Sequence, residues 1–154
     1  EYRQFVTLLE EACLRLAKAI VKDGEGATKL IEVRVSGAPR NNQSARQIAF
    51  SIGRSNLVKT AFFGEDSNWG RIVAAIGNAG VPIDLEKLDI AFGKTCLLSG
   101  GVYQGKTAEK SVSAYLKNQE VTLSIDLHEG PGSATVWSSD LSYDYVKINA
   151  AYRS

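Results

Sequence analysis

The 154-residue sequence contains no methionine, one histidine and two cysteines. With His128 alone, neither a histidine-rich metal site nor a histidine-based proton relay is expected. Cys13 and Cys96 are too few for a disulfide scaffold and form no CxxC pair, so a zinc site is not expected either. Cys13 lies within an apolar helical pattern, which predicts a buried, reduced thiol and a reducing, cytoplasmic compartment. Because translation starts with methionine, the beginning at Glu1 indicates a processed chain or a piece of a longer one.

Long apolar runs and an excess of one charge are also missing. No run approaches the roughly 18 residues that a membrane span needs, and no targeting segment precedes the first helical pattern. The formal net charge is +1 with acids and bases interspersed, so there is no electrostatic footprint for nucleic acid or anionic lipid. The hydrophobic fraction of 44% and the charged fraction of 23% are typical of a globular protein. We therefore expect one domain over residues 1–154, with no cofactor and no metal.

Periodicity predicts a mixture of helices and strands. The expected helices cover Tyr2–Lys22, Ala45–Ile52, a segment capped by Asp66 or Ser67 and running to Ile76, and Thr107–Lys117. The expected strands cover Leu30–Ser36, Leu57–Phe63, Leu88–Phe92 with a continuation over Cys96–Leu98, Val121–Leu127, Ala134–Ser138 and Tyr143–Ala151. The turn at Glu129–Gly132 predicts that the strands on either side of it form a hairpin. The fold class is therefore α+β, with a mixed, mostly antiparallel sheet and packed helices.

A glycine-rich segment gives one functional hypothesis. Gly100–Thr107 matches the phosphate-binding pattern G-x-x-x-x-G-K-[ST], between an expected strand and an expected helix. A phosphate-binding loop belongs to a buried parallel sheet with near-continuous apolar strands, whereas the strand at Val121–Asp126 alternates. Chance similarity is therefore favoured, and a nucleotide-binding module remains the alternative function. A non-catalytic interaction domain is a third reading.

Four polar or aromatic positions also carry a functional and a plainer interpretation. Glu25 lies between two glycines, where a carboxylate on closely approachable backbone suits an ammonium group, although an exposed helix-end acid is the plainer interpretation. Trp69 is expected to anchor the apolar face of its helix, and Arg71 is left open. His128, at a turn after a strand, is expected to be exposed and structural.

The end of the chain carries many polar groups. If Tyr143–Ala151 alternates as a strand, Asn149 shares a face with Lys147 that points away from the core. Because chain termini are usually mobile, an ordered role for Ser154 would require a ligand or a partner chain.

Three segments taken together resemble a known family. They are Asp23–Lys29, Leu57–Ala61 continued by Phe63–Arg71, and Asp140–Ser154. In this order they are similar to signatures of the glutamate N-acetyltransferase (ornithine acetyltransferase) of arginine biosynthesis, and the resemblance runs from the first helix to the last residue. Ser67 and Ser142 stand where that family commonly has proline and threonine, and Ser154 stands where it often ends in threonine. None of these departures removes a functional group at a ligand position.

The resemblance implies a fold, a reaction and partners. It implies the C-terminal domain of the family's beta chain, with a DmpA/ornithine-acetyltransferase-like fold. The family transfers an acetyl group from N-acetylornithine to glutamate through an acetyl-threonine, and the threonine begins the beta chain after self-cleavage. Its own amine suits the role of base. Glu1 is not a threonine, so the nucleophile is expected upstream of this chain or absent from it, and the chain alone should hold no catalytic residue.

The resemblance also assigns substrate contacts. Glu25, Asn149 and Ser154 resemble the residues with which the family holds its amino-acid substrate. An alpha chain from the same precursor supplies the oxyanion hole, in a heterotetramer of two alpha and two beta chains. Members with and without acetyl-CoA as a second donor share these motifs.

Overall fold

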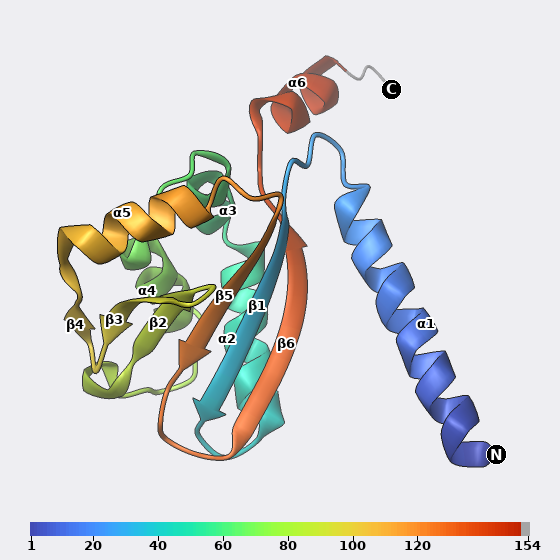
Figure 1. The fold of residues 1–154 in the computed structure, drawn as a ribbon, viewed down its shortest axis with the longest axis horizontal. Helices are drawn as coiled ribbons and strands as arrows, with labels where there is room; N and C mark the ends of the chain where they lie inside the picture. Colours follow the sequence, from blue (N-terminus) through green and yellow to red (C-terminus); the bar gives the residue numbers. More distant parts are fainter. Residues whose placement is uncertain (152–154) are drawn as a thin grey trace.

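A computed structural model of the chain describes residues 1–151, and its centre is a six-stranded sheet (Figure 1). The strands lie in the order β4-β3-β2-β5-β1-β6. Their bounds are β1 Leu30–Ala38, β2 Asp89–Phe92, β3 Thr95–Ser99, β4 Val102–Tyr103, β5 Glu120–Asp126 and β6 Gly132–Ser139. Only the β1–β5 pair is parallel among these neighbours, and the other pairs are antiparallel. The predicted α+β class with a mixed, mostly antiparallel sheet is confirmed.

Six α-helices accompany the sheet in the described residues. They are α1 Tyr2–Lys22, α2 Asn42–Arg54, α3 Asn56–Phe63, α4 Trp69–Gly77, α5 Gly105–Tyr115 and α6 Tyr143–Ala151, with a short 3-10 turn at Leu85–Lys87. In Figure 1, α2, α3 and α4 lie behind the sheet. Side-chain oxygens cap each of these three helices: Asn41 caps α2, Ser55 caps α3 and Asn68 caps α4. The cap of α4 therefore lies one or two residues after the predicted Asp66 or Ser67.

The hydrophobic core fills the space between the sheet and these helices. In β1 and β5 every second side chain points inward, so Ile31 and Val33 of β1 are buried together with Leu123 of β5. From α2, Ile48 and Ile52 are fully buried against them. Full burial of a side chain of this size contributes roughly 1.5–3 kcal/mol, which makes the sheet and α2 the most strongly held part of the fold.

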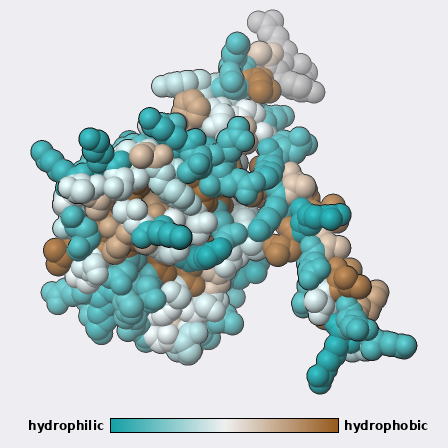
Figure 2. Space-filling view, viewed as in Figure 1, coloured by the Kyte–Doolittle hydropathy of each residue, from teal (hydrophilic) through white to brown (hydrophobic). Residues whose placement is uncertain are grey.

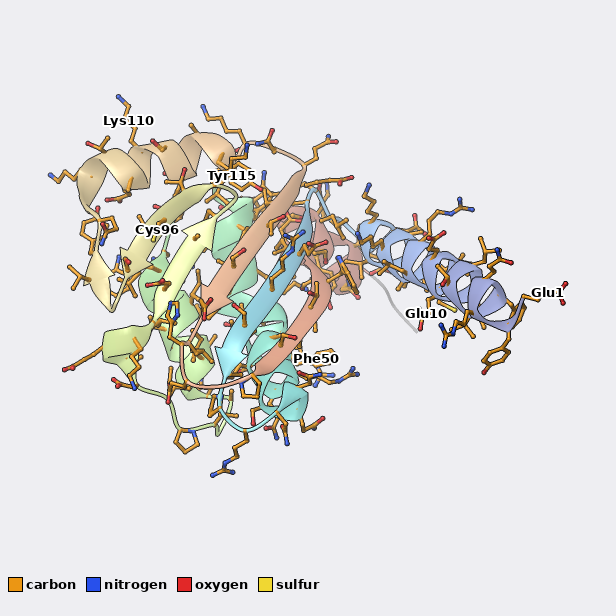
Figure 3. All side chains as sticks on the ribbon, turned by 60° about the horizontal axis from the view of Figure 1, so that its bottom comes forward. Glu1, Glu10, Phe50, Cys96, Lys110 and Tyr115 are labelled. Carbon is orange, nitrogen blue, oxygen red and sulfur yellow. The ribbon has the colours of Figure 1, made fainter. Side chains whose placement is uncertain are left out.

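The opposite face of the sheet is polar. Arg34, Ser36, Ser124 and Asp126 alternate with the buried residues of β1 and β5 and line a hollow of about 670 Å³ with neighbouring strands. Cys96 of β3, labelled in Figure 3, lines the same hollow and is exposed. The alternation predicted for these strands is therefore confirmed, and the polar face of the sheet is open to solvent.

Leu57–Phe63 is a helix, and its prediction as a strand was wrong. Ser55 accepts a hydrogen bond from Val58 N at 3.3 Å, which starts α3, and the buried residues Val58, Ala61 and Phe62 follow helical spacing. The β-branched and aromatic residues that favoured a strand pack instead as one face of a short helix. Because α3 is only eight residues long, tertiary packing outweighs its intrinsic preference.

Trp69 and Arg71, at the start of α4, contact other elements of the fold. Trp69 is 37% exposed and stacks on Tyr103, with ring centroids 6.3 Å apart, so it does not anchor the buried face as predicted. Arg71, which the sequence left open, donates from Nη1 to Leu57 O at 3.0 Å and to Thr60 Oγ1 at 3.3 Å. It joins α4 to α3.

The expected hairpin across Glu129–Gly132 does not form. β6 runs antiparallel to β5 as predicted, but it pairs with β1, which lies between them. The connecting residues cross the end of β1, where Leu127 N donates to Ser36 O and Glu129 N donates to Gly37 O. β1 therefore has a strand on both of its edges and is the second strand from the sheet edge.

Helix α1 is present as predicted, but its apolar residues are not buried. None of its 21 residues is buried, and Cys13 is exposed, which contradicts the prediction of a buried thiol. In Figure 1 the helix runs beside β6 and away from it, so solvent surrounds most of its surface. Figure 2 shows hydrophobic side chains spread along it. Despite its length, neither α1 nor another helix within residues 1–151 is apolar enough to cross a membrane.

Candidate functional site

Asp140 fastens the end of the sheet to the loop after α1. Its carboxylate is buried, with 3% of the residue exposed. Oδ1 accepts hydrogen bonds from Thr28 N and Lys29 N, both at 2.8 Å, and Oδ2 accepts one from Thr28 Oγ1 at 2.5 Å. A buried carboxylate with this set of donors is well compensated. Two of the three family-like segments, far apart in sequence, are thereby held together.

Two residues later, Ser142 positions the last helix. Ser142 Oγ donates to Gly26 O at 2.5 Å and accepts from Tyr145 N at 3.4 Å, the pattern of a helix N-cap. Gly26 has a φ of +67°, and a Cβ on it would lie 2.6 Å from Tyr145 N. Glycine is therefore required here both by the backbone conformation and by the close approach of α6.

Tyr143–Ala151 is a helix, and its prediction as a strand was wrong. The alternation of Val146 and Ile148 with Tyr145, Lys147 and Asn149 resembled a strand, but the Ser142 cap starts a helix that has no buried residue. In this helix Asn149 lies one turn after Tyr145, and its Nδ2 donates to Tyr145 O at 2.9 Å. Asn149 therefore does not share a strand face with Lys147.

The helix brings Asn149 to Glu25. Asn149 Nδ2 donates to Glu25 Oε2 at 2.9 Å, joining residues 124 positions apart. Both side chains are exposed in this chain. In Figure 1 the loop before β1 and α6 lie above the same end of the sheet. Two of the three residues that the resemblance assigned to the substrate are thus in direct contact.

The charge of Glu25 has no cationic partner within residues 1–151, where no Lys, Arg or His lies within 4.0 Å of its carboxylate. One carboxylate oxygen accepts from Asn149. A carboxylate held in place by a neutral amide keeps its negative charge for an incoming cation, and an ammonium group is the matching chemistry.

The third family-like segment joins the same end of the fold. Lys29 is buried, and its Nζ lies 3.5 Å from Asn118 O and 3.9 Å from Glu65 Oε1. Leu141 N donates to Lys59 O at 3.3 Å. The rings of Phe63 and Tyr143 meet edge to face at 5.4 Å. All three segments that carry the resemblance therefore converge around the α1–β1 loop and the start of α6.

Ser154, the remaining predicted site residue, lies outside the described residues 1–151. The positioning roles of Asp140, Ser142 and Lys29 were not predicted from the sequence. In the sequence, only their place in the family-like segments could have pointed to them, because a single polar residue near the end of a strand has no periodicity of its own.

The glycine-rich segment does not form a phosphate-binding loop. β3 and β4 are antiparallel, and Gly100–Gly101 is the turn between them. Three of its amides are already donors: Gly100 N donates to Asp89 Oδ1 at 2.7 Å, Gly101 N to Leu88 O at 2.9 Å and Gln104 N to Leu97 O at 2.9 Å. Phosphate binding needs free amides after a central parallel strand. The nucleotide-binding alternative is therefore contradicted by the geometry.

His128 is exposed and structural, as predicted. Its Nε2 lies 2.8 Å from Asp89 Oδ2, and its Nδ1 lies 3.6 Å from Asp126 Oδ1. The hydrogen bond to Asp89, followed by the charge of Asp126, raises the pKa of His128 above its ordinary value. Burial acts to raise the pKa of Asp89, but the hydrogen bonds from His128 and Gly100 N outweigh it and the pKa is lowered. Within the described part of the chain, no trio of His, Cys, Asp or Glu side chains could hold a metal ion.

Comparison with known proteins shows the family and agrees with the fold. The model of the ArgJ family matches residues 1–154. The "Arginine biosynthesis bifunctional protein ArgJ" of Geobacter sulfurreducens is 52% identical over 98% of this chain, and that of Geobacillus stearothermophilus is 47% identical over 100%. The crystal structure of the Bacillus halodurans protein of the same name superposes with a TM-score of 0.93 at 48% identity, over 98% of this chain.

The fold is that of an α+β protein in which Glu25 and Asn149 meet beyond one end of a mixed sheet (Figure 1). The chain belongs to the ArgJ family. It spans 38% of the length of the Geobacter relative, 37% of the Geobacillus relative and 70% of the solved Bacillus chain.

Proposed function

We propose that this chain is part of a glutamate N-acetyltransferase of arginine biosynthesis, and that it contributes residues that hold the amino-acid substrate. The complete enzyme transfers the acetyl group of N-acetylornithine to glutamate through an acetyl-threonine that lies outside residues 1–154. Family membership supports the reaction class, because the relatives are named as bifunctional proteins of arginine biosynthesis.

The observation that carries the proposal is the Glu25–Asn149 contact. Asn149 Nδ2 holds Glu25 Oε2 at 2.9 Å, and no cation of the described chain neutralises the carboxylate. In our proposal Glu25 accepts the side-chain ammonium of N-acetylornithine. Asn149 fixes the carboxylate, and the hydroxyl of Ser154 contacts a polar group of the same substrate.

The proposed partner is an alpha chain cut from the same precursor, in a heterotetramer of two alpha and two beta chains. The relative lengths support it. The matched stretch is 38% of the Geobacter relative but 70% of the solved Bacillus chain, so that solved chain is only about half as long as the curated relative. A precursor divided into two chains of similar length gives this relation.

The test is the Glu25→Gln substitution in the complete enzyme. Glutamine keeps the size and the hydrogen bond to Asn149 but removes the charge, so one charge-assisted hydrogen bond to the substrate weakens. Such bonds contribute about 1.5–3 kcal/mol, which predicts a loss of roughly ten- to a hundred-and-fifty-fold in kcat/KM for N-acetylornithine. Self-cleavage, followed on a gel, should be unchanged.

Glu86→Gln is the matched control, since Glu86 is an exposed acid of the Leu85–Lys87 turn whose carboxylate has no cationic partner among the described residues. Its kcat/KM should stay within twofold. If the Glu25→Gln enzyme cleaves itself and turns over N-acetylornithine like the control, Glu25 is an ordinary surface acid and the proposed site is wrong.

A further inference from the structure

Helix α1 carries an apolar stripe that nothing in the described chain covers. Tyr2, Phe5, Leu9, Ala12, Leu16 and Ala19 recur at alternating intervals of three and four residues, with Val6, Cys13 and Ile20 beside them. Phe5 is 62% exposed, Leu9 51%, Leu16 64% and Ile20 74%. A stripe of this regularity is the face with which a helix packs against another element.

The stripe points away from the sheet. Lys18, on the opposite side of the helix, reaches Glu32 of β1 at 3.5 Å and lies over the Trp137 ring of β6 at 5.2 Å. In Figures 1 and 3 no other element of the described chain lies on the far side of α1 from the sheet. Glu1 and Glu10 are labelled in Figure 3 and mark the first half of this helix. The apolar side of α1 is thus uncovered, whereas the side that carries Lys18 contacts the sheet.

The second uncovered helix is α6, and both helices lead to the candidate site. Glu25 follows the end of α1 by three residues, and Asn149 lies within α6. α6 also has no buried residue, and its Tyr143 is 82% exposed and Val146 60%. One body of protein covering both helices would also shield the Glu25–Asn149 pair from water.

We propose that α1 is the docking helix for the remainder of the ArgJ-family protein, the part outside the stretch that this chain matches, and that its docking encloses the candidate site. The inference rests on the proposed function. The lengths of the relatives support this occupant, since more than half of each lies outside the matched stretch. Pairing of α1 with a second copy would cover the stripe but would leave α6 and Glu25 in solvent.

The geometry sets what the remainder must present. A helix of 21 residues is about 31 Å long, so the partner surface is an apolar groove of that length, continued by a second apolar area over α6. Near the end of α1 the groove must open onto Glu25, where the proposed ammonium group of the substrate enters. In this arrangement N-acetylornithine and glutamate would reach the site from the side of the partner.

Cys13 provides a direct probe, because it lies directly beside the stripe and is exposed in this chain. The complete protein for the test is the Geobacter sulfurreducens relative, with this 154-residue stretch replacing its 52%-identical counterpart. Alkylation of Cys13 is timed by peptide mass spectrometry in the isolated chain and in the chimera. We expect protection of roughly a hundredfold or more in the chimera, since a covered thiol reacts only through opening.

Two double variants identify the face. Leu9→Lys with Leu16→Lys places two charges on the stripe and should restore rapid alkylation of Cys13 in the chimera. Gln4→Lys with Thr7→Lys places the same added charge on the other side of α1 and should leave the protection within threefold. Because all four positions are exposed in this chain, circular dichroism should show both variants of the isolated chain folded.

Equal alkylation of Cys13 in the isolated chain and the chimera would overturn the proposal. Concentration-dependent protection already present in the isolated chain would assign the stripe to a second copy, and so would also overturn it. The two proposals have separate readouts. If Cys13 is protected in the chimera and Glu25→Gln turns over at the wild-type rate, the docking stands and the assigned site is wrong. If Cys13 is unprotected in the unsubstituted chimera and Glu25→Gln reduces turnover, the docking alone is wrong.

Discussion

At the scale of single residues, Asp140 has the largest structural role that the sequence does not reveal. It is a buried acid that accepts three hydrogen bonds from Thr28 and Lys29. No cation lies within 4.0 Å of it in the described chain, so backbone and hydroxyl donors provide the compensation. The candidate site therefore depends on a residue that does not touch it.

Asp140→Ala should destabilise the chain by about 2–4 kcal/mol, because it leaves the part-buried amide of Thr28 and the buried amide of Lys29 without their acceptor. Asp140→Asn keeps an oxygen for both amides and should lose only about 1 kcal/mol. Urea unfolding monitored by tryptophan fluorescence measures both. Equal losses for the two variants would mean that the charge, and not the acceptor geometry, stabilises this junction.

Gly26 shows how one position sets the path of the chain. Gly26 and Gly80 have nearly the same backbone conformation, with φ of +67° and +70°, but only Gly26 has atoms of α6 close to its missing Cβ. Both alanine substitutions should cost the strain of a left-handed backbone, about 1–3 kcal/mol. Gly26→Ala should add a further loss of about 1–3 kcal/mol from overpacking and should displace α6.

Thermal unfolding of the two glycine variants isolates the clash, since the backbone strain is common to them. Displacement of α6 should also break the Asn149–Glu25 contact, which chemical-shift changes of the Asn149 side-chain amide would report. A Gly26→Ala protein as stable as Gly80→Ala, with an unchanged amide signal, would contradict the close approach described above.

At the scale of elements, the segments with a strict period were predictable and those with a looser pattern were not. Tyr2–Lys22 keeps the helical period over 21 residues, and Val121–Leu127 alternates strictly between apolar and polar residues. Leu57–Phe63 and Tyr143–Ala151 are seven and nine residues long, and in both the β-branched and aromatic residues suggested strands. A capping serine decided each case, Ser55 in one and Ser142 in the other.

The order in which the strands pair could not be predicted from the sequence for a related reason. β5 and β6 both alternate, so their patterns fit either edge of β1 or each other equally well. In the observed order β1 has a hydrogen-bonded partner on both edges, which the alternation alone does not indicate. Likewise, family-like segments pointed to Glu25 and Asn149, but their contact requires α6 to be a helix.

The connection from β5 to β6 is tied to β2 by a pH-dependent contact. His128 has a raised pKa, so its contribution to stability is complete below its ordinary value of 6.5 and is lost as pH rises through the raised value. Asp89 has a lowered pKa, so its contribution is present above its ordinary value of 3.8 and is lost as pH falls through the lowered value. Both contributions are present together between these ordinary values.

His128→Asn tests this contact without new backbone strain, because asparagine tolerates the φ of +51° found there. The midpoint of urea unfolding should fall between pH 6 and pH 8 in the original chain and should be flatter across that range in the variant. If both proteins show the same slope, the His128–Asp89 contact does not contribute to stability in solution.

At the scale of the whole molecule, the chain should fold without being active. Its core of sheet and α2–α4 is complete within residues 30–140, while α1 and α6 bury no side chain. We expect cooperative urea unfolding together with no transfer of acetyl from N-acetylornithine to glutamate. Measurable conversion by the pure 154-residue chain would refute the division of function between this chain and the remainder of the enzyme.

The position of β1 in the sheet has a consequence for synthesis. β1 ends at Ala38, but both of its neighbours, β5 and β6, lie beyond residue 119. At roughly 5–20 residues per second, the ribosome needs on the order of 5–20 s to supply them. During that interval β1 has two unpaired edges and an apolar face, the combination that favours aggregation. The nascent chain should therefore depend on chaperones in this window, and slowing translation between β1 and β5 should lower the yield of folded protein.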